Sequence, residues 1–130
     1  MGKSLIYCAN VNSQTINAND TVNFGNVVRR FGNIGSEGGN IVTNEAGYYT
    51  AFVNLTVAGT AAGSTTFQVN YNGVPVSGGK ATTTTSATSI NSLCIPVTIR
   101  QNCCCSRSIT VTASGTTVNV TNAAIEVVKE

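Results

Sequence analysis

The sequence predicts an all-β protein, an antiparallel sandwich or barrel. Apolar and polar residues alternate along several segments, which is typical of strands with one face in a core. Turn-forming residues separate these segments about every ten residues, and no segment keeps a helical period. The chain has 130 residues, so we expect a single domain over residues 1–130.

The clearest strand is expected at residues 47–57, which read GYYTAFVNLTV. The odd positions from 49 to 57 are all apolar, and most even positions are polar. Tyr48 and Phe52 break the pattern because they place aromatic rings on the polar face. That face is either ordinary exposed apolar area or a surface that another subunit covers, and we favour the second interpretation. The subunit interface is then predicted at Tyr48, Thr50, Phe52 and Asn54.

The elements before this strand are short. Asparagine, aspartate and glycine mark the turns and loops between them. They are expected in this order: a strand at 5–11, a turn at 15–20, a weakly alternating segment at 21–25 with Val22 and Phe24 on one face, a strand at 27–31, a loop at 34–40 and a strand at 41–43.

The elements after it include a hairpin. Residues 66–71 alternate and end in Asn72-Gly73, a strong hairpin signal because both residues accept positive φ. Pro75 lacks a backbone donor, so the returning strand is expected to be an edge strand or very short. Residues 77–89 are rich in Gly, Thr and Ser, and either an exposed strand or an ordered loop fits them. The remaining elements are expected as a strand at 93–99, a loop at 100–107, a strand at 109–113, a strand beginning at 118 and a last strand at 123–128.

Composition excludes several classes of partner. Only 9% of the residues are charged, against about 25% in ordinary domains, so Thr, Ser, Asn and Gln must keep the surface hydrated. The net charge is +2 and the largest basic cluster is Arg29-Arg30, which does not predict nucleic-acid binding. No apolar run approaches the ~20 residues of a membrane span. The run after Lys3 is too short for a signal peptide, so we expect synthesis in the cytoplasm without one.

The residues of common active sites are missing. The chain has no histidine and only five acidic residues, which excludes Ser-His-Asp and Cys-His catalysis in their usual forms. Its paired glycines match no phosphate-binding fingerprint. We therefore expect a protein that is not an enzyme and that needs no cofactor and no metal.

Several features together resemble a known family. They are Asn23-Phe24, Gly47 followed by Tyr49 and Phe52, the hairpin from Asn72 to Val76, and the final apolar strand. Their order and spacing resemble the C1q/TNF-like jelly rolls, especially the short bacterial and phage type and the C-terminal domains of collagen-like spore-surface proteins. The resemblance implies an antiparallel two-sheet jelly roll that forms a homotrimer, with apolar and aromatic side chains around the threefold axis. Tyr48 and Phe52 would then lie in the trimer.

The five cysteines are the unusual feature. Cys8 and Cys94 are expected to be small buried hydrophobic residues. The run Cys103, Cys104 and Cys105 lacks zinc spacing, and adjacent cysteines rarely bridge each other. Three interpretations stay open for this run: side chains that point inward at a strand end, disulfides within or between subunits, or thiols of several trimer loops gathered around a soft metal.

Three functions compete. The leading hypothesis is a structural, homotrimeric surface module of a particle, a phage virion first (capsid decoration or fibre head) and a spore surface second, with other surface proteins of that particle as partners. A low-charge sandwich without an export signal motivates it, since virion proteins leave by lysis. The second is an adhesin head that binds a receptor or host-surface glycan through loops 33–40 and 77–89. The third is a redox or metal-handling protein centred on Cys103–Cys105.

Overall fold

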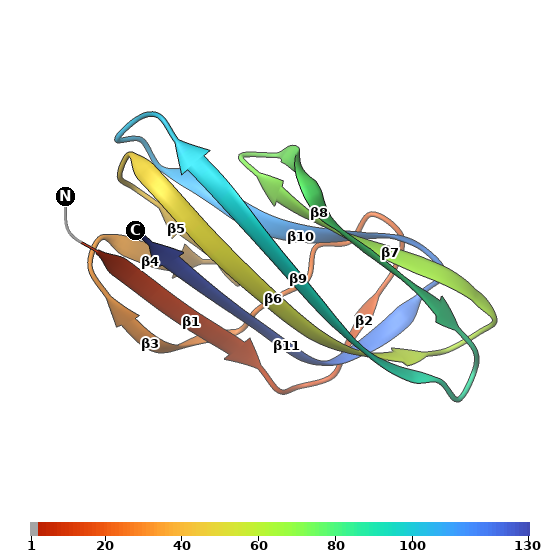
Figure 1. Ribbon diagram of the computed structural model, residues 1–130. Coiled ribbons are helices and arrows are strands. Elements are labelled where there is room, and N and C mark those ends of the chain that lie inside the picture. Colours follow the sequence, from red (N-terminus) through yellow and green to blue (C-terminus); the bar gives the residue numbers. More distant parts are fainter. Residues whose placement is uncertain (1–2) are drawn as a thin grey trace.

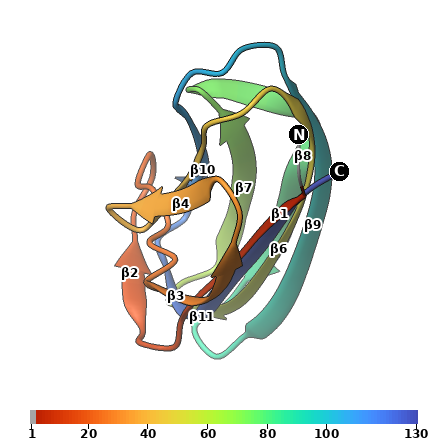
Figure 2. The same cartoon turned by 90° about the vertical axis from the view of Figure 1, so that its left-hand side faces the viewer.

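The computed structural model describes residues 3–130. These residues form eleven β-strands and no helix, arranged as two antiparallel sheets that pack face to face (Figures 1 and 2). This is the predicted two-sheet jelly roll. No helix within residues 3–130 is long and apolar enough to cross a membrane.

The six-stranded sheet has the order β3-β1-β11-β6-β9, and β2 pairs with β11 beside this path. Its strands are β1 (Ser4–Asn10), β2 (Gln14–Ile16), β3 (Asn26–Phe31), β6 (Gly47–Gly59), β9 (Ile90–Gln101) and β11 (Val118–Lys129). The predicted central strand is therefore β6, which is paired along nearly its whole length on both sides.

The five-stranded sheet has the order β4-β5-β10-β7-β8. Its strands are β4 (Ile34–Glu37), β5 (Asn40–Thr43), β7 (Gly63–Tyr71), β8 (Val74–Thr85) and β10 (Arg107–Gly115). β8 is an edge strand, as Pro75 predicts, although its twelve residues make it long. The threonine run of residues 82–85 belongs to this strand and is not a loop.

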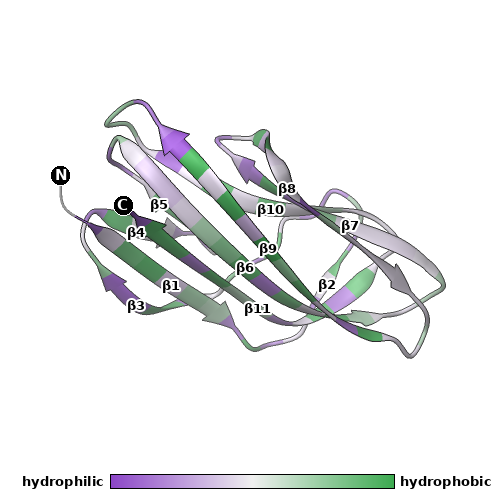
Figure 3. Ribbon diagram, viewed as in Figure 1, coloured by the Kyte–Doolittle hydropathy of each residue, from purple (hydrophilic) through white to green (hydrophobic). Residues whose placement is uncertain are grey.

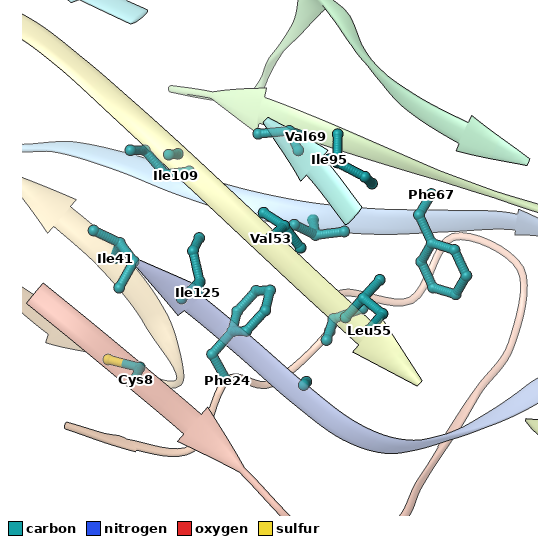
Figure 4. Close-up of a cluster of buried hydrophobic side chains, with 14 of the residues drawn as sticks. Cys8, Phe24, Ile41, Val53, Leu55, Phe67, Val69, Ile95, Ile109 and Ile125 are labelled. Carbon is teal, nitrogen blue, oxygen red and sulfur yellow. The ribbon is translucent and has the colours of Figure 1, made fainter. Parts of the chain in front are cut away.

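The core fills the space between the sheets. The odd positions of β6 from Tyr49 to Val57 are at most 2% exposed, as their alternation predicts. Figure 4 shows Val53 and Leu55 of this strand among Ile125 from the same sheet and Phe67 and Ile109 from the other sheet. One face of each sheet thus packs in the core, and the side chains between the core positions point outward.

The β7–β8 hairpin turns where the sequence predicts it. Asn72 has φ 51° and Gly73 has φ 79°, and Tyr71 pairs directly with Val74 across the turn. Positive φ at both central residues is the geometry that Asn-Gly favours.

Four sequence-based expectations need correction. The strand expected to begin at 118 and the last strand expected at 123–128 are one continuous strand, β11. The expected loop at 34–40 is the β4–β5 hairpin. Ile34 and Ile41 are buried, so both strands pack against the core. The expected turn at 15–20 begins inside β2, where Ile16 is buried. Residues 21–25 bury Val22 and Phe24 as expected, but they form a single bridge to β10 in place of a ladder strand.

Candidate functional site

The predicted interface residues all lie on the outward side of the six-stranded sheet. In β6, Tyr48 is 52% exposed and Phe52 is 39% exposed, while Asn54 is exposed and Thr50 is half-buried. They alternate with the core positions, so they share one face. The structure therefore places the four residues on one outward face, and their role in a subunit interface stays a prediction.

The register of the sheet extends this patch across four neighbouring strands. One cross-strand row runs from Arg29 through Tyr7, Glu126 and Phe52 to Pro96. We call the patch the aromatic face and define it by these outward residues: Leu5 and Tyr7 of β1, Arg29 and Phe31 of β3, Tyr48, Thr50, Phe52 and Asn54 of β6, Pro96, Thr98 and Arg100 of β9, and Glu126 and Val128 of β11. Sequence reasoning missed the residues outside β6, because strand order and register are not visible along the chain.

A second apolar row lies beside the first. Phe31, Leu5 and Val128 are consecutive neighbours across β3, β1 and β11. Phe31 is 55% exposed, and Leu5 and Val128 are half-buried. Figure 3 shows largely apolar colours along β1 and β11 and nearly neutral colours along the threonine-rich β8. Apolar and aromatic side chains in neighbouring rows are the composition of the central part of a protein interface.

The charges on the aromatic face are few. Arg29 and Arg100 are exposed, and the half-buried Glu126 lies between Tyr7 and Phe52 in its row. Within residues 3–130 no group forms a hydrogen bond or ion pair with the Glu126 carboxylate. This acid is therefore available to a cation from outside the chain.

The cysteines fall into three environments. Cys8 is buried, and burial raises the pKa of its thiol more than the opposing hydrogen bond with Ser36 lowers it. Cys94 is exposed and faces outward beside Asn54, so the expectation that it is buried is wrong. Its neighbours Leu93 and Ile95 face the core, which leaves position 94 on the opposite side of the strand.

Cys103, Cys104 and Cys105 lie in the connection between β9 and β10, as expected. We call residues 102–106 the thiol loop; it lies beside the start of β6 (Figure 1). Cys103 and Cys105 are half-buried, and Cys104 is exposed. Within residues 3–130 no three side chains of His, Cys, Asp or Glu are grouped as ligands for a metal ion.

A buried amide holds the thiol loop. Gln101 is 1% exposed, and its Nε2 donates to the carbonyl oxygens of Cys103 at 3.0 Å and Cys105 at 2.7 Å. Its Oε1 accepts a hydrogen bond from the hydroxyl of the buried Thr43. Sequence reasoning missed Gln101, although a polar residue at an inward position of an alternating strand is a usable signal.

Arg107 adds a positive charge beside the loop. Its Nη1 donates to the Ser106 carbonyl oxygen at 3.3 Å. Burial raises the pKa of the Tyr71 hydroxyl, and the Arg107 charge opposes this rise. The pKa of Cys103 is lowered, first by the hydrogen bond from the Cys105 thiol. Burial opposes this with the second largest effect, and a backbone hydrogen bond with Cys105 and, least of all, the Arg107 charge lower the pKa further. The pKa of Cys105 is raised, mainly because its proton is engaged with Cys103. The two thiols therefore differ in acidity, with Cys103 the more acidic of the two.

Comparison with solved structures identifies the fold. Eiger TNF from S. frugiperda has a TM-score of 0.75 and 8% identity over 98% of this chain and 91% of that one. Murine APRIL at pH 5.0 has a TM-score of 0.71 and 12% identity over 99% and 100% of the two chains. The phage vertex protein P5 of PRD1 has a TM-score of 0.58 and 14% identity over 97% and 96%.

No family model and no curated protein matches the sequence. The structural neighbours share between 8% and 14% of their residues with this chain, so the likeness concerns the fold alone. The fold is a TNF-like jelly roll, as the resemblance in sequence implies.

Proposed function

We propose that the protein is a non-enzymatic structural module that assembles as a homotrimer through its aromatic face and lies on the surface of a particle, with a phage virion preferred to a spore. The observation that supports trimer formation is that aromatic rings and aliphatic side chains point outward in adjacent rows of one sheet. A particle surface fits the low charge of the chain and its likeness to a vertex protein.

A second copy is the occupant that the chemistry of this face favours. The face carries both an acid without a partner among residues 3–130 and two exposed arginines, so two copies offer each other complementary charges. An acid enclosed among aromatic rings is costly without a cation. We propose that the Glu126 carboxylate of one copy forms an ion pair with Arg29 or Arg100 of the next copy.

The mass in solution tests this proposal. Sedimentation equilibrium of the purified protein at micromolar concentration is expected to give three times the chain mass of 13.4 kDa. A monomer at that concentration would overturn the assembly. Immunogold labelling of particles from the producing host, before and after lysis, then distinguishes a virion from a spore surface, and labelling of neither would reject the particle.

A glycan-binding head is the second candidate, and one surface favours it. The outward side of the five-stranded sheet carries hydroxyl and amide groups in register, with Thr66 of β7 opposite Thr82 of β8. Gln68 lies in the next outward row, opposite the exposed Lys80. Neither of the segments first expected to bind, 33–40 and 77–89, is mainly a loop, so the site would lie on this sheet. Glycan-array binding that Thr66→Val and Thr82→Val together abolish would support it; no binding to any glycan would reject it.

A further inference from the structure

In the thiol loop, the backbone carbonyl groups of two of the three cysteines accept hydrogen bonds from one donor. The same nitrogen, Nε2 of Gln101, binds the carbonyl oxygens of both Cys103 and Cys105, so the backbone must fold around that amide. The chain bends at all three cysteines. The Cys103 and Cys105 side chains are half-buried, whereas Cys104 is exposed. One amide nitrogen that binds both carbonyl groups therefore keeps residues 103 and 105 close together before any bond forms.

The backbone spacing selects this pair for a disulfide. Bridged cysteines have Cα atoms about 4.4–6.8 Å apart. Adjacent residues are separated by only about 3.8 Å, which is too short, and a fully extended pair two positions apart spans about 7 Å, which is too long. The bend at Cys104 shortens the second distance. Cys103 and Cys105 are thus the pair in this loop that can bridge without distorting a peptide bond.

We propose that Cys103 and Cys105 form a dithiol site that exchanges with low-molecular-weight disulfides, with Cys103 as the attacking thiolate and Cys105 as the resolving thiol. Cys104 takes no part. This proposal does not depend on trimer formation, because every group that it uses lies between β9 and β10 of one chain or is packed against that connection.

The exchange proceeds in two balanced steps. The Cys103 thiolate attacks one sulfur of the disulfide R–S–S–R, forms a Cys103–S–S–R bond and expels RS⁻. Cys105 then loses its proton to solvent and attacks the Cys103 sulfur, which forms the Cys103–Cys105 bond and releases the second RS⁻. The two cysteines lose two electrons and two protons in total, and the external disulfide is reduced to two thiols.

The surroundings suit these roles. The guanidinium of Arg107 favours the thiolate at Cys103 and attracts an anionic disulfide. Two further contacts fix the C-terminal end of the loop: the Ser106 hydroxyl donates to Asn44 Oδ1 at 2.9 Å, and the Thr43 hydroxyl lies 3.4 Å from the Arg107 carbonyl oxygen. A fixed loop keeps the resolving thiol close to the first bond that forms.

The test uses glutathione disulfide as the probe. The folded protein is incubated in buffers of increasing glutathione disulfide, free thiols are blocked with a first alkylating reagent, and the sample is then reduced and labelled with a second. Trypsin cleaves after Arg100 and Arg107, so one peptide carries all three loop cysteines. The second label is expected on Cys103 and Cys105, and the first on Cys104. A bridge that includes Cys104, or bridges between chains at this loop, would overturn the proposal.

Three variants separate the roles, and circular dichroism verifies that each is folded. Cys104→Ser is expected to keep the bridge. Cys105→Ser is expected to accumulate a mixed disulfide with glutathione at Cys103, because no resolving thiol remains, and Cys103→Ser is expected to form no bridge. If Cys105→Ser accumulates no mixed disulfide at Cys103, the assigned order of attack is wrong. Phe52→Asp is expected to exchange like the parent protein, so a failure of the trimer proposal would remain distinguishable.

Discussion

Arg100 lies over the ring of Tyr48, with its Cζ 5.5 Å from the ring centroid. The two residues are direct partners in the β6–β9 ladder, so both belong to the aromatic face. A contact of this kind at an exposed site contributes about 0.5–1 kcal/mol. Tyr48 is therefore held in place before any partner arrives, and a side chain that is fixed in advance loses less freedom on binding.

Phe52→Asp is expected to dissociate the trimer and leave the sandwich folded. The substitution places a charge at the centre of the aromatic face, beside Glu126, and removes an aromatic anchor. The core is untouched, because Phe52 points away from it. Sedimentation is expected to give a monomer with a β-type circular dichroism spectrum. A matched control is Thr66→Asp, which places the same charge on the outward side of the other sheet and is expected to stay trimeric. A Phe52→Asp protein that remains trimeric would remove the aromatic face from the interface.

Reversing the charge of Glu126 tests the assigned ion pair. Glu126→Arg is expected to weaken assembly by about 2–5 kcal/mol for each contact, because two cations then meet across the interface. Adding Arg29→Glu or Arg100→Glu is expected to restore assembly for whichever arginine is the partner. Glu37→Arg, on the exposed end of β4, serves as the control and is expected to leave assembly unchanged. If neither double variant recovers the trimer, Glu126 does not pair with an arginine of another copy.

The sequence predicted the fold well where alternation is strong. β6 and the Asn72-Gly73 turn follow directly from local patterns, since both depend on neighbours in the chain. The β4–β5 hairpin was missed because its glycines indicate a loop, whereas the buried Ile34 and Ile41 that hold it contact distant strands. Local composition does not contain that tertiary contact.

The candidate sites were predicted in part for the same reason. Tyr48 and Phe52 stand out within one strand as rings on a polar side. Tyr7 and Glu126 join them only through the pairing of β1, β11 and β6, which no single segment reveals. Cys94 was expected to be buried from its residue type alone, but its position in the alternation of β9 decides its exposure. For Cys94, the alternation of the strand therefore predicts exposure better than the residue type does.

Gln101→Leu is expected to lower the free energy of unfolding by about 1–3 kcal/mol. Leucine has a similar size but leaves the carbonyl oxygens of Cys103 and Cys105 without their donor. Urea denaturation at a fixed protein concentration measures the change. Asn102→Ala alters the exposed neighbouring residue and is expected to change stability by less than about 0.5 kcal/mol. Equal stability of Gln101→Leu and the parent protein would mean that solvent replaces the amide.

The reactivity of Cys103 is expected to depend on pH with a midpoint below that of an ordinary thiol. Only the thiolate is alkylated, so the rate rises through the pKa and then levels off, and a lowered pKa moves this rise to lower pH. Cys105→Ala removes the hydrogen bond that lowers the pKa most, and Arg107→Gln removes the cation, so both are expected to move the midpoint to higher pH. Rates of iodoacetamide labelling at Cys103 between pH 5 and 10, read by mass spectrometry, measure the shift. Arg100→Gln serves as the control, because Arg100 lies near the same end of β9 but packs over the Tyr48 ring. The midpoint for Cys103 in this variant is expected to match that of the parent protein. An unchanged midpoint in Cys105→Ala would mean that the two thiols do not share a proton, and the dithiol assignment would then fail at its first step.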